Sequence, residues 1–309
     1  MAQIVLEDLP LHEREEFLAK ISWDTEERKR LVADLQKNCN RYRITQNAKL
    51  IVLGQPITHT ITKTEWGISY KINNGIEAEV SVLKEEQELD GGWKELFSLM
   101  KKLTSPLQKI IFKLSLKGYI LEVANRGEIL ERWNTVKTEF IDDESFSDII
   151  QLGDKDYLDP LQSIRKNIIY QLFFFSLYKP DFRSGQSVNT IGKDVFLQSV
   201  IFPECNFKTD VEEKIYERNR GYSFYNQYTI NQKIDRGQIK SLYKKKYKQF
   251  MIQNTGSDNE ISDYFISYDS KYKILEETGT LIHSKTVFQE NVNDNLYYKS
   301  DIEIELINK

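Results

Sequence analysis

Alternation of apolar and polar positions predicts antiparallel strands in two separate parts of the chain. In the first part, the run 76–83 alternates and follows an Asn-Asn-Gly turn at 73–75, so it is expected to form a hairpin with the extended run 66–72. A second hairpin is expected from the runs 110–116 and 119–123. The strands of the second part are expected at 195–201, 211–218, 222–234, 261–268, 271–276, 280–289 and 296–307, with tail turns at 269–270, 278–279 and 293–295.

Apolar residues at helical spacing predict helices before and between these two parts. Asn125 is expected to cap one of them, with Glu128 three positions later as its capping-box partner. The helix that starts at Asp159 and Pro160 is apolar nearly all round, which indicates a buried, central element. The helices are expected at 11–43, from 91 to about 105, at 125–140, within 145–178 and at 236–251.

This order of elements predicts an α+β fold in which a large, curved, half-barrel-like antiparallel sheet packs against a central group of helices. Residues 1–45 are expected to form an N-terminal helical segment and residues 46–309 a single α+β domain. The alternative is a split near residue 150 into two strand-rich halves. The chain has 309 residues and 40% apolar content, which is enough to build a core for either arrangement.

Charge and cysteine content narrow the classes of function. Charged residues make up 29% of the chain but nearly cancel to −4, so no global attraction to nucleic acid is expected. The two cysteines, Cys39 and Cys205, lie far apart and have no metal-ligand spacing.

The N-terminus lacks the features of a secretory signal. The most apolar run, 170–178, is about half the roughly 20 residues that a membrane span needs. A cytoplasmic location is therefore expected.

Catalytic signatures are absent from the sequence. His12, His59 and His283 each stand alone, with no histidine or cysteine at metal-ligand spacing. There is no Gly-x-Ser-x-Gly elbow and no glycine-rich phosphate loop. These absences favour a non-enzymatic protein without a cofactor or a bound metal. Acidic-x-lysine steps leave a metal-dependent nuclease open as a second alternative; they are Asp210 with Glu212 and Lys214, and Asp263 with Asp269 and Lys271.

The tail resembles the final meander of bacterial half-barrel carrier proteins, in which a curved sheet wraps around helices and holds lipid or lipoprotein chains. The resemblance rests on 268–271, 278–281 and 301–306. The middle, from 105–107 through 118–123 to Arg132-Trp133, looks like a module of uncharacterised bacterial proteins associated with secretion. The first resemblance implies an apolar ligand, and the second implies an adaptor, chaperone or immunity role.

The sequence therefore predicts an intracellular binding or adaptor protein with a protein partner, for example an immunity or escort protein for a secreted effector. The alternative is a carrier of an apolar ligand such as lipid. The basic helix 236–251 is expected to turn its tyrosines to the core and its lysines to water, which disfavours a nucleic-acid site. The residues chosen for ligand or partner binding are large aromatics on the predicted helices: Trp93, Phe97, Trp133, Phe173, Tyr243 and Tyr247.

Overall fold

Eleven antiparallel strands form one open sheet, and the first and last strands of the described chain pair at its middle. The computed structural model describes residues 40–53, 55–72, 76–89, 94–114, 120–161, 164, 190–202, 204–248, 252–253, 264–276 and 280–308. The strand order is β5-β4-β3-β2-β1-β11-β10-β9-β8-β7-β6. Adjacent strands in the sheet are therefore consecutive in sequence, except at the β1–β11 pair, and the consecutive strands β5 and β6 form the two edges.

The strands come in two consecutive sets along the chain. The first set is β1 (Asn40–Val52), β2 (Gln55–Ile72), β3 (Ile76–Leu89), β4 (Lys109–Leu114) and β5 (Ile120–Val123). The second set is β6 (Thr190–Gln198), β7 (Asn206–Asn219), β8 (Tyr222–Lys233), β9 (Phe265–Leu275), β10 (Thr280–Asn293) and β11 (Leu296–Asn308). Twelve residue pairs between β1 and β11 join the two sets into one sheet.

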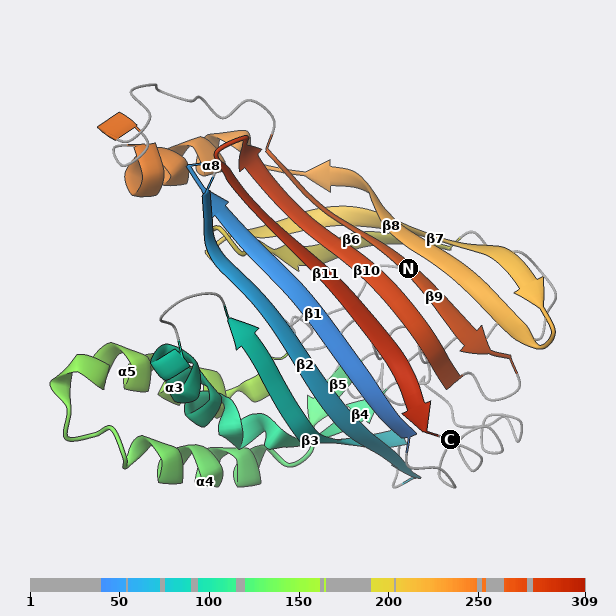
Figure 1. Cartoon of the computed structure of the whole chain (residues 1–309), viewed down its shortest axis with the longest axis horizontal. Helices are drawn as coiled ribbons and strands as arrows, with labels where there is room; N and C mark the ends of the chain where they lie inside the picture. The colour runs from blue at the N-terminus through green and yellow to red at the C-terminus, as the bar shows by residue number, and fades with distance from the viewer. Residues whose placement is uncertain are drawn as a thin grey trace, which may run out of the picture.

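In Figure 1, β6, β7 and β8 cross behind β9, β10 and β11 at a steep angle, which shows that the sheet is strongly twisted. Three α-helices gather beside β3, β4 and β5, and α8 lies at the opposite end of the long strands. The helical elements are α3 (Lys94–Thr104), α4 (Arg126–Lys137), α5 (Ser147–Leu158) and α8 (Arg236–Tyr243), with the 3₁₀ turns Ser105–Gln108 and Glu144–Phe146 and the π-helical turn Lys244–Lys248. The expected α+β fold, with a large antiparallel sheet and helices, is confirmed.

Two hydrophobic cores lie along the inner face of the sheet, the face that the helices cover. The first core surrounds Tyr42, Phe112 and Trp133, which are all at most 1% exposed, and includes residues of α4 and α5. The second core surrounds Phe202 and Ile239, both fully buried, and includes the far ends of β1, β9, β10 and β11. The inner face is therefore apolar at both ends of the long strands.

Several predicted elements need correction. Residues 40–43 belong to β1 rather than to the helix predicted over 11–43, whose remaining residues lie outside the described chain. The turn predicted at 269–270 does not exist, because β9 runs unbroken from Phe265 to Leu275, so the tail is a meander of three strands.

Asn125 does not cap α4 with its side chain, although it stands at the N-cap position. Its amide oxygen instead accepts from the backbone N–H of Ile111, at 2.8 Å, and its amide nitrogen donates to the carbonyl of Lys109, at 3.0 Å. The side chain thereby ties the start of α4 to β4. The cap of α8 follows the expected chemistry, because the Asp235 carboxylate accepts from the backbone N–H groups of Gly237 and Gln238.

Candidate functional site

A row of polar side chains crosses the inner face between the two cores. Residues directly opposite each other in a sheet share one face, so the strand register places the row on a single level. Seven strands contribute one member each, and β11 interrupts the row with Ile302. The members are Gln87 on β3, Thr62 on β2, Gln46 on β1, Thr286 on β10, Ser270 on β9, Gln227 on β8 and Glu213 on β7. We call this set the polar row.

The polar row lies at the boundary between the cores. On β9, Tyr272 belongs to the first core and Tyr268 to the second, and Ser270 is the inward-facing residue between them. On β1, Ile44 belongs to the first core, and Gln46 is the next inward-facing residue. The row therefore separates two apolar surfaces with one line of hydrogen-bonding groups.

Some side chains of the polar row form hydrogen bonds with other side chains of the sheet. The hydroxyls of Ser270 and Thr286 bond to each other at 2.8 Å, and the amide nitrogen of Gln46 donates to the hydroxyl of Ser300 at 3.0 Å. Gln227 is only 3% exposed. Among the described residues, the buried amide oxygen of Gln87 lacks a hydrogen-bond partner. Buried polar groups without a partner cost free energy, so the amide oxygen of Gln87 needs a reason to be there.

Tyrosines surround the β7 end of the polar row. The hydroxyl of Tyr272 donates to the carboxylate of Glu213, which is 6% exposed. The ring of Tyr272 stacks on that of Tyr225 with centroids 4.8 Å apart and an interplanar angle of 2°. Burial, aided by the Glu213 charge, raises the pKa of Tyr268 and of Tyr272 above the usual value. These tyrosines therefore keep their protons and present aromatic faces and hydroxyls to the interior.

Glu290 on β10 is a buried carboxylate that anchors the loop after β6. It accepts from the backbone N–H groups of Val200, at 2.7 Å, and Ile201, at 3.1 Å. It also accepts from the hydroxyls of Ser199 and of Tyr264, the latter at 2.7 Å. With four donors, Glu290 is fully satisfied. It acts as a structural anchor of the second core rather than as an open binding group.

Glu290 is expected to make the stability of the protein depend on pH. Burial raises its pKa above the ordinary 4.5, although the four hydrogen bonds oppose this. The folded state therefore holds the proton more tightly than the unfolded chain. The stability contributed by the protonated group is fully present below the unfolded pKa and is lost as pH rises through the folded pKa.

The Glu290→Gln variant removes this titration. We expect its free energy of unfolding, measured relative to the wild type by urea denaturation, to improve as the pH rises above the ordinary pKa of 4.5. A difference that stays constant as the pH rises would contradict the prediction.

Three of the aromatic residues predicted to bind a ligand or partner have described side chains, and all three pack into the cores. Trp133 is 1% exposed, and its indole N–H donates to Asp154 at 2.7 Å. Tyr243 is 3% exposed in the second core, and Tyr247 is half-buried with its ring 5.9 Å from that of Phe202. The expected inward orientation of these two tyrosines is confirmed. Trp93 and Phe173 lie outside the described residues, as does the side chain of Phe97.

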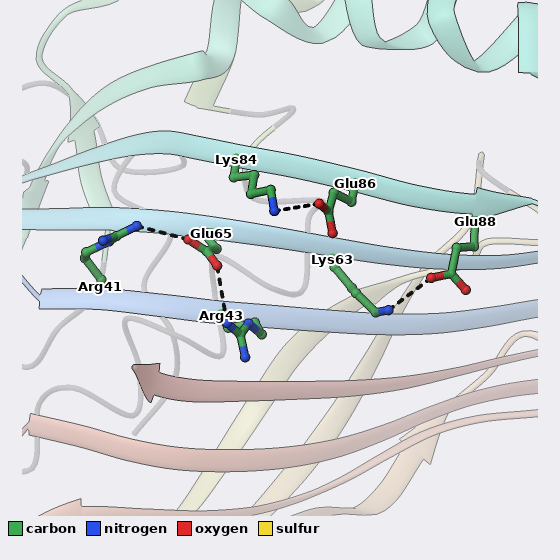
Figure 2. A network of polar contacts seen from close by, with 7 residues as sticks. All are labelled: Arg41, Arg43, Lys63, Glu65, Lys84, Glu86 and Glu88. Carbon is green, nitrogen blue, oxygen red and sulfur yellow. Dashed lines mark hydrogen bonds and ion pairs between the residues drawn. The ribbon is translucent and has the colours of Figure 1, made fainter. Parts of the chain in front are cut away.

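The outer face of the sheet carries charges of alternating sign (Figure 2). On neighbouring strands, Lys84, Glu65 and Arg43 stand directly opposite one another. Glu65 pairs with Arg43 at 3.4 Å and with Arg41 at 3.1 Å. Further pairs on this face join Lys63 to Glu88 and Lys84 to Glu86. Since the charges neutralise each other locally, this face offers no broad field of one sign to a nucleic acid.

The structure describes the acidic-x-lysine step at 210–214 and part of the one at 263–271. Glu212 pairs with Lys214 at 2.8 Å and accepts from the hydroxyl of Tyr228. Asp269 stands opposite Tyr228 on the far side of β8, so a whole strand separates it from Glu212. Among the described residues, no candidate metal group includes any of these carboxylates. Asp263 lies outside the described residues.

Sequence reasoning missed the polar row, although a signal for it exists. The inward-facing residues of β9 are Ile266, Tyr268, Ser270, Tyr272 and Ile274, in which one small polar residue interrupts an apolar series. The same interruption led to the wrong prediction of a turn at 269–270. Recognising the row requires the register of several strands at once, because no single strand distinguishes it from a turn.

Comparisons with known proteins assign no family. No protein-family model matches the chain, and no curated protein matches it. Among solved structures, the chain is similar to lipovitellin, in a structure described for its lipid–protein interactions, with 13% identity and a TM-score of 0.44. The match covers 87% of this chain and 25% of that chain, so this chain spans a quarter of that length. Within the described ranges, no helix has the length and apolar character needed to cross a membrane.

Proposed function

We propose that the protein is a non-enzymatic carrier that holds an apolar ligand, such as a lipid, against the inner face of its sheet. The observation that supports this proposal is the polar row between two apolar cores, in which the buried amide oxygen of Gln87 has no hydrogen-bond partner among the described residues. A ligand with a hydrogen-bonding group between apolar parts would satisfy both features, because its polar group meets the row and its apolar parts meet the cores.

The amide of Gln227 defines the chemistry of the ligand further. It offers two N–H donors and one carbonyl acceptor. The hydroxyls of Ser270 and Thr286 stand on the same level of the two following strands. An ester, amide or hydroxyl group within an otherwise apolar molecule matches this set. A purely hydrocarbon ligand would offer the amide of Gln227 no hydrogen bond.

A protein partner, as for an adaptor or immunity protein, is the rival proposal. The part of the outer face that the structure describes is the broad surface open to such a partner, and many of its charges already pair within the sheet. Exposed pairs of this kind contribute little binding energy when they are exchanged for intermolecular ones. The inner face therefore offers the better-defined binding chemistry.

The Gln227→Leu variant tests the carrier proposal. We expect native mass spectrometry of gently purified wild-type protein to show a small added mass that is lost on denaturation. The variant is expected to carry several-fold less of this ligand, since leucine has the size of glutamine but no hydrogen-bonding group. Gln289→Leu is the matched control, because it makes the same substitution on the outer face of β10.

Three outcomes distinguish the proposals. Equal ligand loads in both variants, or a bare wild-type chain, would contradict the carrier proposal. A stoichiometric protein adduct on the wild type would instead support the adaptor proposal. After removal of the ligand, Gln227→Leu is expected to be at least as stable as the wild type in urea denaturation, because a buried amide that the proposed ligand would satisfy has been replaced by an apolar side chain.

A further inference from the structure

Three side chains with metal-binding atoms meet on the outer face of β10 and β11. His283 on β10 stands directly opposite Glu305 on β11, and Glu303 lies two residues along the same strand and therefore on the same face. Their ligand atoms all lie within 4.8 Å of one another. Nε2 of His283 and a carboxylate oxygen of Glu303 are 2.9 Å apart. Within the residues that the structure describes, this is the one group of its kind.

The donor set selects the class of ion. Zinc and similar transition-metal ions accept imidazole nitrogen together with carboxylate oxygen at about 2.0–2.2 Å. Calcium and magnesium prefer oxygen ligands alone and usually need more of them. We propose that His283, Glu303 and Glu305 bind a divalent transition-metal ion of the zinc class, with the fourth coordination position open to water.

The surroundings of the site hold the ligands close without blocking access. The backbones of β10 and β11 are fixed by ten residue pairs between them. The side chains of His283 and Glu303 are 35% and 37% exposed, so an ion can reach them from solvent. Because only side-chain rotations are needed to bring ligand atoms from their present spacing to coordination distance, the sheet itself does not have to change.

Two positively charged side chains lie beside the site and affect how tightly it can bind a metal ion. The ammonium group of Lys285, opposite Glu303, lies 3.1 Å from the same carboxylate oxygen that contacts His283. Arg43 on β1 stands opposite Glu305. An incoming ion must displace Lys285, whose side chain is 65% exposed and free to turn away. Removing this competing charge should therefore strengthen metal binding.

An ion at this position would act independently of the carrier function proposed above. The three ligands lie on the outer face, whereas the polar row lies on the inner face of the same strands. The ion would link β10 to β11 beside the pairing of β11 with β1. Since it would bind the folded protein in preference to the unfolded chain, it should also raise the thermal midpoint of unfolding.

Zinc titration of the full-length protein, in competition with a chromophoric chelator, tests the site. We expect one equivalent to bind, and we expect His283→Ala, Glu303→Gln and Glu305→Gln each to weaken that binding by about tenfold or more. Lys285→Gln is expected to strengthen it, which a salt bridge without a metal role would not predict. His59→Ala is the matched control, because His59 lies on β2 with its Nε2 3.1 Å from the Asn47 amide oxygen.

The proposal is overturned if His283→Ala binds the first equivalent of zinc as tightly as the wild type. It is also overturned if His59→Ala loses as much affinity as His283→Ala, since the binding would then lie elsewhere. All of these substitutions are on the outer face, so circular dichroism should show the wild-type fold for each variant. Ligand retention in native mass spectrometry should be unchanged in His283→Ala, which separates this site from the proposed carrier function.

Discussion

Replacing Glu290 with leucine is expected to lower the free energy of unfolding by about 3–5 kcal/mol. The carboxylate accepts four hydrogen bonds, and leucine accepts none. The backbone N–H groups of Val200 and Ile201 would then be left without their acceptor, and that of Ile201 lies in the second core. A buried donor that loses its partner costs more free energy than an average hydrogen bond contributes, because no other interaction offsets its desolvation.

The damage should begin in the loop that Glu290 holds. This loop places Ile201, Phe202 and Cys205 in the second core, and its backbone closes on itself with a bond from the N–H of Ser199 to the carbonyl of Cys205 at 3.0 Å. Without its anchor, the loop should open before the sheet unfolds. Hydrogen exchange at 199–205 should therefore accelerate more than exchange in the central strands.

Urea denaturation with two comparison variants measures this effect. Glu290→Gln keeps the shape and a carbonyl acceptor, so its loss should be smaller than that of the leucine variant. Glu86→Leu, on the exposed outer face, should leave the midpoint close to that of the wild type. A Glu290→Leu protein within about 1 kcal/mol of the wild type would show that the anchor contributes far less than its four hydrogen bonds indicate.

A methyl group added at Gly153 is expected to destabilise the protein by about 1–3 kcal/mol. Gly153 lies on α5 against the ring of Trp133 on α4. A Cβ atom there would lie 2.3 Å from Cζ2 and 2.5 Å from Cη2 of that ring. The ring cannot easily yield, because it is 1% exposed, packs against Tyr157 at 4.9 Å and is held by its hydrogen bond to Asp154.

A double-mutant cycle isolates this contact. Trp133→Phe removes Cζ2 and Cη2, the two ring atoms that the new methyl group would meet at the shortest distances, so Gly153→Ala should cost little in that background. Gly127→Ala on α4 is the matched control: no atom lies within 4 Å of its added Cβ, and alanine favours a helix over glycine, so no loss is expected. Equal costs of Gly153→Ala in both backgrounds, measured by urea denaturation, would rule out the clash.

Local sequence patterns were sufficient to predict most of the individual helices and strands. The alternation at 76–83 correctly predicts β3, and the spacing after Asp235 correctly predicts an inward-facing Ile239 and Tyr243 on α8. Such predictions succeed because each strand or helix must place its own apolar residues on one face. They fail where a polar residue faces inward, as at Ser270, or where a capping residue bonds elsewhere, as at Asn125.

The candidate binding residues depend on contacts that no single element shows. Large aromatics such as Trp133 and Tyr243 were chosen as candidates for ligand or partner binding, and the structure places both in the hydrophobic cores, so their role in binding stays a prediction. His283 stands alone in the sequence, and only the pairing of β10 with β11 brings it to Glu303 and Glu305. Sites of this kind form between strands, so spacing along a single strand cannot reveal them.

The sequence by itself determined that this chain forms an α+β protein with long antiparallel strands, because alternation and helical spacing are local properties. Only the tertiary structure decided that β1 pairs with β11, which joins the two strand-rich parts into one sheet. That pairing, with the register of the other strands, aligns Gln46, Ser270 and Gln227 on one level. Register depends on contacts between residues far apart in the chain, and for this reason the polar row appears only in the folded protein.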